Sequence, residues 1–222
     1  NIIKNFVNID NRIRTVRLDK STGGPAYPRN VGMKEANGDY LAFLDADDIW
    51  DKDKLKLQID YITKSEIDFL HCDAEYIDNM GKKSGVIKKS KFYSVLRKIF
   101  GDSFAILAIN PITLSSCIVK NSNNISFRTD STFHAIEDWF LWIDLSFRGK
   151  KLYKLNKTLV YYRVHNSSIS IANGLMQYYK GFSLYSLLLV EKKINLIKFL
   201  ILMGIHIFRI LKYKILGRNH KS

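Results

Sequence analysis

The chain has 222 residues, of which 46% are hydrophobic, so it can bury a core and is not a disordered chain. Its two cysteines, Cys72 and Cys117, are too few for a disulfide framework and favour a reducing compartment such as the cytoplasm. The formal net charge is +14, and eight of the basic residues lie after residue 191, with no acidic residue among them. Because the charge gathers in this tail and the body shows no zinc-finger or RNP-type motif, we expect no nucleic-acid partner.

The predicted elements alternate between strands and helices along the chain. The strands are expected at residues 14–18, 40–44, 69–76, 112–119 and 158–164. The helices are expected at residues 29–36, 52–64, near 93–100, 135–147, and from about 175 onward. Asp51 is the expected N-cap of the second helix, whose apolar face is formed by Leu55, Ile59 and Ile62. This alternation predicts an α/β fold with a mostly parallel sheet covered by helices.

The stretch "YLAFLDADDIW", residues 40–50, leads an apolar strand into three carboxylates. In open α/β sheets ligands bind beyond the carboxyl ends of the strands, which is where Asp45, Asp47 and Asp48 lie. Alternation along an extended chain puts Asp45 and Asp47 on the same side, where they repel each other unless a cation lies between them. Carboxylate oxygens suit Mg²⁺ or Mn²⁺, which keeps open positions for phosphate oxygens. The residues themselves therefore favour a metal–diphosphate site.

Three other interpretations of this run compete with a metal–diphosphate site. In the first, Asp48 or Asp51 only caps the following helix. The second, an EF-hand, is excluded because Trp50 occupies the sixth position, which needs glycine, and Lys56 the twelfth, which needs glutamate. The third is an aspartyl phosphohydrolase, which also has Asp-x-Asp after an apolar strand. That class usually has a small hydroxyl residue and glycine soon after, and this chain has neither there.

Three segments carry a resemblance to a known family. "GGPAYPRNVGMKEANGDYLAFLDADDIWDKDKLKLQ", residues 23–58, closely resembles the inverting family 2 glycosyltransferases of the GT-A fold. "EDWFLWIDLSFRG", residues 137–149, resembles the family's Glu-Asp pair with its apolar helix, and "YYRVHNSSIS", residues 161–170, resembles the segment that often closes the catalytic domain. Ser21 and Pro28 depart from the family pattern, which affects only local loop geometry. The resemblance implies a GT-A catalytic domain over 1–170 and a helical tail over 171–222.

The resemblance implies transfer of a sugar from a nucleotide-sugar, first of all a UDP-sugar, to a hydroxyl with inversion. Asp45 and Asp47 would hold Mn²⁺ or Mg²⁺ against the diphosphate and so neutralise charge on the leaving group. Asp138 is the expected general base, with Glu137 as the next candidate; the alternative for Asp138 is a first-turn acid favoured by the helix dipole. The implied donor-binding residues are Gly23, Gly24, Pro25, Arg29, Asn30, Asp45, Asp47 and His165.

Several of these residues have a structural alternative. Arg29 either pairs with phosphate or holds its loop, whereas the glycines at 23–24 allow close approach of the backbone to the donor. His165 either reaches the metal or diphosphate, or serves a structural role. Trp139 and Trp142, three positions apart on one helix, either stack on an acceptor sugar or pack in the core, which is the commoner arrangement.

The C-terminal tail is apolar but interrupted by basic residues. Its longest run without a charged residue, 199–208, is far shorter than the roughly 20 residues that a membrane span needs. On a helical wheel Lys198, Arg209 and Lys212 share one side, so we expect a helix lying in the plane of an anionic membrane surface. The alternative is a helix packed on the domain or on a partner subunit. A membrane-surface tail fits a saccharide or lipid-linked acceptor in bacterial cell-surface polysaccharide synthesis, at the inner face of the cell membrane.

The resemblance also implies that the chain begins after the family's first strand, helix and second strand, which bind the nucleotide base. We therefore expect an N-terminally truncated transferase, whose activity as a fragment is left open. The competing hypothesis is a non-catalytic, transferase-like module that binds membrane, a partner or polysaccharide. An upstream turn of the Asp-Asp-Gly-Ser type would favour the enzyme, whereas a natural start near Asn1 would favour the module.

Overall fold

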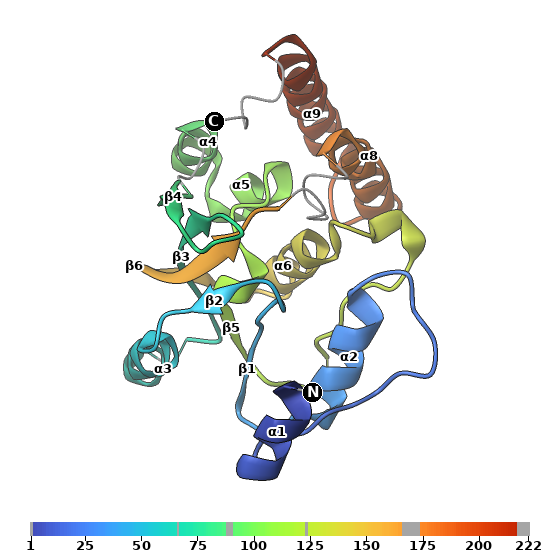
Figure 1. Cartoon of the computed structure of the whole chain (residues 1–222). Helices are drawn as coiled ribbons and strands as arrows, with labels where there is room; N and C mark the ends of the chain where they lie inside the picture. Colours follow the sequence, from blue (N-terminus) through green and yellow to red (C-terminus); the bar gives the residue numbers. More distant parts are fainter. Residues whose placement is uncertain (1, 66, 88–90, 123, 166–173, 217–222) are drawn as a thin grey trace.

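The computed structural model describes residues 2–65, 67–87, 91–122, 124–165 and 174–216 (Figure 1). The strands are β1 (Tyr40–Ala42), β2 (Ile49–Trp50), β3 (Phe69–Ile77), β4 (Lys83–Val86), β5 (Cys117–Lys120) and β6 (Leu152–Arg163). The helices are α1 (Ile2–Ile9), α2 (Ala26–Glu35), α3 (Lys54–Ser65), α4 (Lys91–Phe100), α5 (Asp102–Ala108), α6 (Glu137–Phe147), α8 (Gly174–Val190) and α9 (Leu196–Leu216), with short 3₁₀ turns η1 (Leu114–Ser116) and η2 (Ser131–Phe133). Each element expected after residue 26 is present, although η1 shortens the strand expected at 112–119 to β5.

The sheet is mixed. Its strands follow the order β1-β5-β3-β6-β2, and β4 pairs with one end of β3. β3 and β6 run parallel, with Phe69 opposite Leu152 and Ile77 opposite Arg163, while the other described pairs are antiparallel. The α/β class is confirmed, but the expectation of a mostly parallel sheet is wrong because β5 enters antiparallel between β1 and β3. An apolar run indicates that a strand is buried on both faces, and it carries no information about the direction of the neighbouring strand.

Apolar side chains fill the space on both faces of the sheet. On one face α5 and α6 pack against it (Figure 1). There Trp142 of α6 stacks on Phe69 with ring centroids 4.9 Å apart. On the other face Ile62 of α3 packs against Leu70 and Ile118. Phe69 and Leu70 face opposite cores because side chains alternate along a strand. The sequence of α6 is apolar nearly all round because this helix lies between the sheet and the C-terminal helices.

The helix α3 begins as expected but presents a different face to the core. A backbone N–H two residues later donates to Asp51 Oδ1 at 3.0 Å, which is the expected cap. The predicted apolar face is partly wrong: Leu55 is 44% exposed, whereas Lys54 and Ile62 are buried. Lys54 occupies the inner position because its Nζ lies over the Trp50 ring, 4.1 Å from the centroid, where a cation is attracted by the aromatic face.

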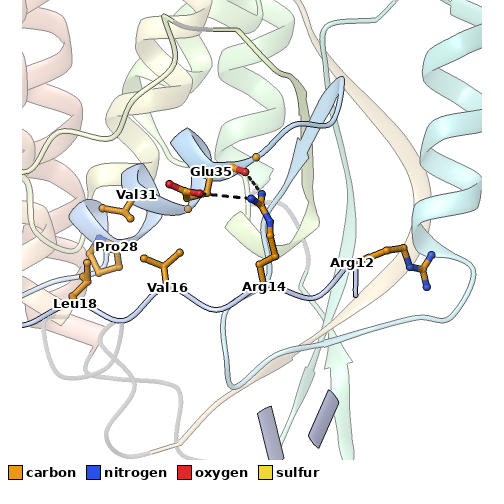
Figure 2. A pocket seen from close by; sticks show the side chains of 9 residues that line it. Arg12, Arg14, Val16, Leu18, Pro28, Val31 and Glu35 are labelled. Carbon is orange, nitrogen blue, oxygen red and sulfur yellow. Dashed lines mark hydrogen bonds and ion pairs between the residues drawn. The ribbon is translucent and has the colours of Figure 1, made fainter. Parts of the chain in front are cut away.

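Residues 14–18, expected to form a strand, run instead as an irregular, largely exposed chain beside α2 (Figure 2). The Arg14 side chain pairs with Glu35 at the end of α2, with 3.6 Å between Nη1 and Oε2. Together with α2 this segment borders a surface cavity of about 450 Å³. The strand prediction is wrong because a strand needs a neighbour for its N–H and C=O groups, and none of the described strands pairs with this segment.

The tail forms a hairpin of α8 and α9 that packs on α5 and α6 (Figure 1). Tyr185 of α8 donates its hydroxyl to Leu107 O at 3.0 Å. Inside the hairpin the buried His206 places Nε2 2.5 Å from Tyr178 O and occupies the space beside Gly181, where a Cβ would clash with the imidazole. The helical tail is therefore confirmed. Within the described ranges, none of the helices combines the length and the apolar character needed to cross a membrane.

Candidate functional site

The three carboxylates after β1 lie in a tight turn that leads into β2. The N–H of Asp48 donates to Asp45 O at 3.1 Å and closes the turn. Asp48 points inward, where its side chain accepts from Ser115 Oγ at 2.5 Å and from Arg163 N–H at 3.0 Å. The side chains of Asp45 and Asp47 stay 33% and 43% exposed. Asp48 therefore anchors the turn instead of capping a helix, and Asp45 and Asp47 remain accessible to a ligand.

Ser115 of η1 holds this turn in place through hydrogen bonds. No pattern in the sequence predicted this role for Ser115. Besides its bond to Asp48, Ser115 Oγ accepts from the Asp45 N–H at 3.1 Å, and Ser115 O accepts from Trp50 Nε1 at 2.7 Å. Burial raises the pKa of Asp48 to about 6, with the charges of Asp45 and Asp47 adding to it and the bonds from Ser115 and a backbone N–H opposing it. The turn is thus held at a fixed place above β5 by contacts far apart in sequence.

Arg29 of α2 joins the carboxylate turn to the start of α6. Its Nη2 lies 2.6 Å from Asp45 Oδ1, and its Nη1 lies 2.9 Å from Glu137 Oε1. The side chain of Arg29 is 18% exposed and that of Glu137 is 7% exposed, so water screens the second pair little. Asp45 and Glu137, which are 16 and 108 positions from Arg29 along the chain, therefore bind the same guanidinium. Arg29 brings the predicted metal-binding turn and the predicted base segment together.

Asp138 lies beside Glu137 in the first turn of α6 and is half-buried. Its Oδ2 accepts from Asn110 Nδ2 at 3.1 Å, and its Oδ1 accepts from the Trp139 N–H at 2.7 Å. Burial, and then the negative charge of Glu137, raises the pKa of Asp138 to about 7, although both hydrogen bonds and Arg29 oppose the rise. A carboxylate with this pKa can accept a proton near neutral pH, as a general base must.

The segment after β6 approaches the same turn from the other side. His165 Nε2 lies 3.0 Å from Asp47 Oδ2, and Arg163 Nε donates to Asp47 O at 2.9 Å. The structure thus places His165 at the carboxylates, although the sequence pointed there only through its motif. Arg163 belongs to the same motif, but its role in holding the turn was not predicted. The rest of that motif, residues 166–170, lies outside the described residues.

The remaining predicted donor-binding residues, around the start of α2, are Gly23, Gly24, Pro25 and Asn30. Gly23 has a φ of 72°, a conformation that favours glycine, and a Cβ on Gly24 would lie 2.5 Å from His134 Nδ1. Pro25 is the N-cap residue of α2. Asn30 uses both ends of its amide on the Phe127 backbone, at 2.8 and 2.7 Å. These contacts hold the loop and α2 in place, and a donor-binding role for the four residues stays a prediction.

Both tryptophans of α6 are core residues, which confirms the packing alternative. Trp142 is 1% exposed and stacks on Phe69. Trp139 is 4% exposed and donates Nε1 to Ile106 O at 2.6 Å. One edge of Trp139 nevertheless borders a cavity that also includes Asn110, the partner of Asp138.

Asp45 and Asp47 fit a hard divalent cation as two carboxylate donors. Mg²⁺ and similar ions are commonly held by one or two carboxylates, and waters or phosphate oxygens complete the coordination. Within the part of the chain that the structure describes, no group of three His, Cys, Asp or Glu side chains could hold an ion by itself. This donor set suits an ion shared with a substrate diphosphate and does not suit a closed structural zinc site.

Comparisons with known proteins agree with this geometry. Residues 1–116 match the model of the family described as glycosyl transferase family 2. The UDP-Glc:α-D-GlcNAc-diphosphoundecaprenol β-1,3-glucosyltransferase WfgD of Escherichia coli is 30% identical over 164 residues, which are 72% of this chain and 59% of WfgD. An uncharacterized glycosyltransferase of Haemophilus influenzae is 31% identical over 108 residues, which are 49% of this chain and 43% of that protein. The chain thus spans roughly half the length of these relatives.

Solved structures of S. aureus TarS share the fold. Full TarS superposes with a TM-score of 0.60 at 18% identity, over 98% of this chain and 36% of TarS. TarS residues 1–349 in complex with UDP-GlcNAc give a TM-score of 0.58 at 19% identity, over 85% of this chain and 53% of that one. Identity this low shows the fold alone, whereas the family match covers more than half of the present sequence. From its carboxylate turn, its Glu-Asp helix and these matches, we conclude that the chain belongs to glycosyl transferase family 2.

Proposed function

We propose that the protein is a metal-dependent inverting glycosyltransferase that moves a sugar from a nucleotide-sugar to a hydroxyl of a saccharide or lipid-linked acceptor. The observation that carries this proposal is the bridge from Asp45 through Arg29 to Glu137, next to Asp138. It joins an accessible pair of carboxylates, suited to a metal–diphosphate, to a carboxylate whose pKa suits proton transfer. The two functions that a single displacement needs are therefore supplied side by side.

The carboxylate turn is proposed as the donor side of the site. Asp45 and Asp47 would hold Mn²⁺ or Mg²⁺, which when bound neutralises charge on the leaving nucleoside diphosphate. Arg29 and His165 orient these two carboxylates, and the anchor at Asp48 fixes the turn that carries them. The structures of TarS with UDP and with UDP-GlcNAc support a UDP-sugar as the donor.

Asp138 is proposed as the general base. Its carboxylate would take the proton from the acceptor hydroxyl as that oxygen forms its bond to the anomeric carbon. The bond from this carbon to the diphosphate oxygen breaks in the same displacement, and the diphosphate leaves with the electron pair. Glu137 is the weaker candidate because its Oε1 is occupied by Arg29. Asn110 and the Trp139 N–H hold Asp138 in one orientation for this transfer.

The acceptor is proposed to be a component of a bacterial cell-surface polysaccharide. WfgD is named for an acceptor sugar on diphosphoundecaprenol, and the S. aureus TarS sequence is named a poly(ribitol-phosphate) β-N-acetylglucosaminyltransferase. The chain is 23% identical to TarS over 150 residues. The two relatives differ in acceptor, but both are named as transferases that add a sugar to a phosphate-linked acceptor. Glycan assembly is the shared class that we propose for this chain.

The outer face of α9 is proposed to lie on an anionic membrane surface. Five apolar residues along this face are each more than half exposed: Ile197, Leu200, Phe208, Leu211 and Ile215. On the helical wheel Lys198 and Lys212 flank one side of this stripe and Lys214 the other, and all three are exposed. The opposite face is the one packed in the hairpin. An apolar stripe between lysines is the pattern of an in-plane interfacial helix, to which each base near the surface adds about 1 kcal/mol.

The apolar surface continues from α9 onto α4. Phe92 of α4 approaches Phe208 of α9 with ring centroids 6.5 Å apart. Val95 and Ile99, on the same side of α4, are 50% and 64% exposed, with Lys98 beside them. Two elements from distant parts of the sequence thus form one basic-edged apolar face. This apolar face supports a peripheral location at a membrane. Both cysteines are free, as is usual in the reducing cytoplasm, which supports the inner face of the cell membrane.

The proposed reaction is tested by screening nucleotide-sugars for nucleoside diphosphate release with and without Mn²⁺, using the protein from its natural start. Asp47→Asn is the site variant, and Asp53→Asn, an exposed carboxylate on the next turn, is the matched control. We expect release that requires both the metal and Asp47 and that survives in the control. Release without metal would contradict metal dependence. No release and no metal-dependent nucleotide binding across the panel would leave a transferase-shaped binding module.

A further inference from the structure

A polar cavity of about 230 Å³ lies between the C-terminal hairpin and the start of α6. The lining residues that matter here are Asn110 after α5, Trp139 of α6, and Gln177, Tyr178 and Arg209 of the hairpin. We name this space the hairpin cavity. It adjoins the proposed base, because Asn110 both lines it and donates Nδ2 to Asp138 Oδ2. A ligand in the cavity would therefore share a hydrogen-bonding residue with the base.

Arg209 brings to the cavity a positive charge that no described carboxylate neutralises. Its Nη1 donates to Ala108 O at 2.8 Å, and its guanidinium lies 5.0 Å from the centroid of the Tyr178 ring. These contacts fix the side chain and leave further N–H groups of the guanidinium for a ligand. Among the ion pairs of the described residues, none involves Arg209. A half-buried cation without a counter-ion favours the binding of an anion.

The other walls of the cavity are neutral or aromatic. His206 is fully buried, and burial, followed by the charge of Arg209, lowers the pKa of this imidazole to about 4. It is therefore uncharged at neutral pH, and Arg209 is the cation of the lining. Trp139 and Tyr178 add aromatic surface, and Gln177 adds an amide. Aromatic walls with a few fixed polar groups are typical of sites for small ring-shaped ligands.

We propose that the hairpin cavity binds the acceptor and that Arg209 binds a phosphate group on it, while the attacking hydroxyl lies at Asp138. This inference rests on the proposed function, because it assigns the substrate of the same site. Phosphate is the anion we infer, since the planar guanidinium matches its oxygens with two parallel hydrogen bonds. The phosphate could belong to a soluble sugar phosphate or to a lipid-linked sugar. On the helical wheel of α9, Arg209 lies next to Lys198, which flanks the face proposed to contact the membrane.

Binding is the first test, because it does not depend on turnover. The protein is titrated calorimetrically with a panel of hexose 1-phosphates and with the matched free hexoses. The variants are Arg209→Gln, Arg209→Lys and Gln177→Glu, which places a negative charge in the cavity. Lys64→Gln removes a positive charge from an exposed position in the last turn of α3, outside the cavity and the proposed membrane face, and is the control. Melting curves show which variants are folded, and Gln177→Glu decides the test if Arg209→Gln is not.

The wild-type protein should bind at least one hexose 1-phosphate about tenfold or more tightly than its free hexose, as a charge-assisted bond predicts. Arg209→Gln and Gln177→Glu should abolish this preference, Arg209→Lys should keep part of it, and Lys64→Gln should keep all of it. Equal binding of phosphates and free sugars, no binding of either, or a preference that survives Arg209→Gln would overturn the inference.

Nucleoside diphosphate release in the same preparations separates this inference from the proposed function. If no donor gives nucleoside diphosphate release, the proposed transferase activity is contradicted. The titrations would still decide whether the cavity binds a phosphate-bearing sugar. Release that is equally efficient with phosphate-bearing and neutral acceptors would overturn the cavity assignment alone. A final comparison uses the preferred sugar as its 1-phosphate and as an isoprenyl diphosphate in mixed micelles. Preference for the second assigns the phosphate to a lipid-linked acceptor, and equal use assigns it to a soluble one.

Discussion

Replacing Asp138 by asparagine should stabilise the fold at pH 8 while it strongly slows sugar transfer. Burial and Glu137 raise the pKa of Asp138 from 3.8 to about 7 in the folded protein. Because the folded-state pKa lies above the unfolded one, ionising Asp138 destabilises the fold progressively as the pH rises from about 4 to about 7, and the whole effect is present at pH 8. The difference between these pKa values corresponds to an upper bound of about 4 kcal/mol.

The hydrogen bonds around Asp138 reduce this gain. Its two oxygens accept from Asn110 and from the Trp139 N–H, and an asparagine has only one oxygen to offer. Losing one acceptor costs about 1 kcal/mol, which leaves a net stabilisation of about 1–3 kcal/mol. For a chain of this size, about 2–4 °C of melting temperature corresponds to each kcal/mol. The variant should therefore melt about 2–12 °C above the wild type at pH 8.

Thermal unfolding followed by circular dichroism at pH 8 and pH 5 checks this prediction. At pH 5 Asp138 is largely protonated in the wild-type fold but ionised in the unfolded chain, so roughly a third of the effect is already present. The lost hydrogen bond should offset most of this remaining gain, and the two melting temperatures should lie close together. Asp144→Asn on the same helix is the control. Asp144 pairs with Arg148 at 2.6 Å, so this substitution removes an ion pair and should lower the melting temperature at both pH values. An Asp138→Asn melting temperature equal to or below that of the wild type at pH 8 would refute the reasoning. Transfer by the variant should fall by a factor of about 10²–10⁴, as for a lost general base.

Three further predictions concern the bridge, the base and the membrane face. Arg29→Met leaves Glu137 buried and unpaired, so it should lower the free energy of unfolding measured in urea by about 3–5 kcal/mol. Adding Glu137→Gln should recover much of that loss, because the buried charge is then removed. An unchanged urea midpoint in Arg29→Met would contradict the bridge. Asn110→Ala removes a hydrogen bond to the charged form of Asp138, which should raise the pKa of this carboxyl. The acid limb of the pH–rate profile should therefore move to higher pH. An acid limb that stays in place would mean that Asp138 is not the titrating base. Phe208→Asp should reduce flotation with phosphatidylglycerol vesicles at least severalfold with little effect on neutral vesicles, whereas unchanged flotation would count against membrane contact by α9.

Much of the candidate site could be predicted from the sequence because its signals are local. An apolar strand that runs into Asp45 and Asp47 indicates a ligand site at the end of that strand. The Glu137–Asp138 pair is followed directly by the apolar helix it begins, so the position of these acids in the first turn could also be predicted. Caps and periodicity depend on neighbours within a few residues, and for that reason α2, α3 and α6 begin and end close to the predicted bounds.

Only the tertiary structure decided which of these residues meet and which face inward. Asp48 and Asp45 differ little in local sequence, but Ser115, 67 positions from Asp48, binds one carboxylate and leaves the other for Arg29. The direction of β5 and the absence of a pairing strand beside residues 14–18 in the described chain likewise depend on strand partners distant in sequence. In the sequence Arg209 is one of several basic residues of the tail. Only the packing of the hairpin shows that its side chain points toward the end of α5. Local patterns determine what an element is, whereas its partners are chosen by packing and pairing over the whole chain, which no local pattern encodes.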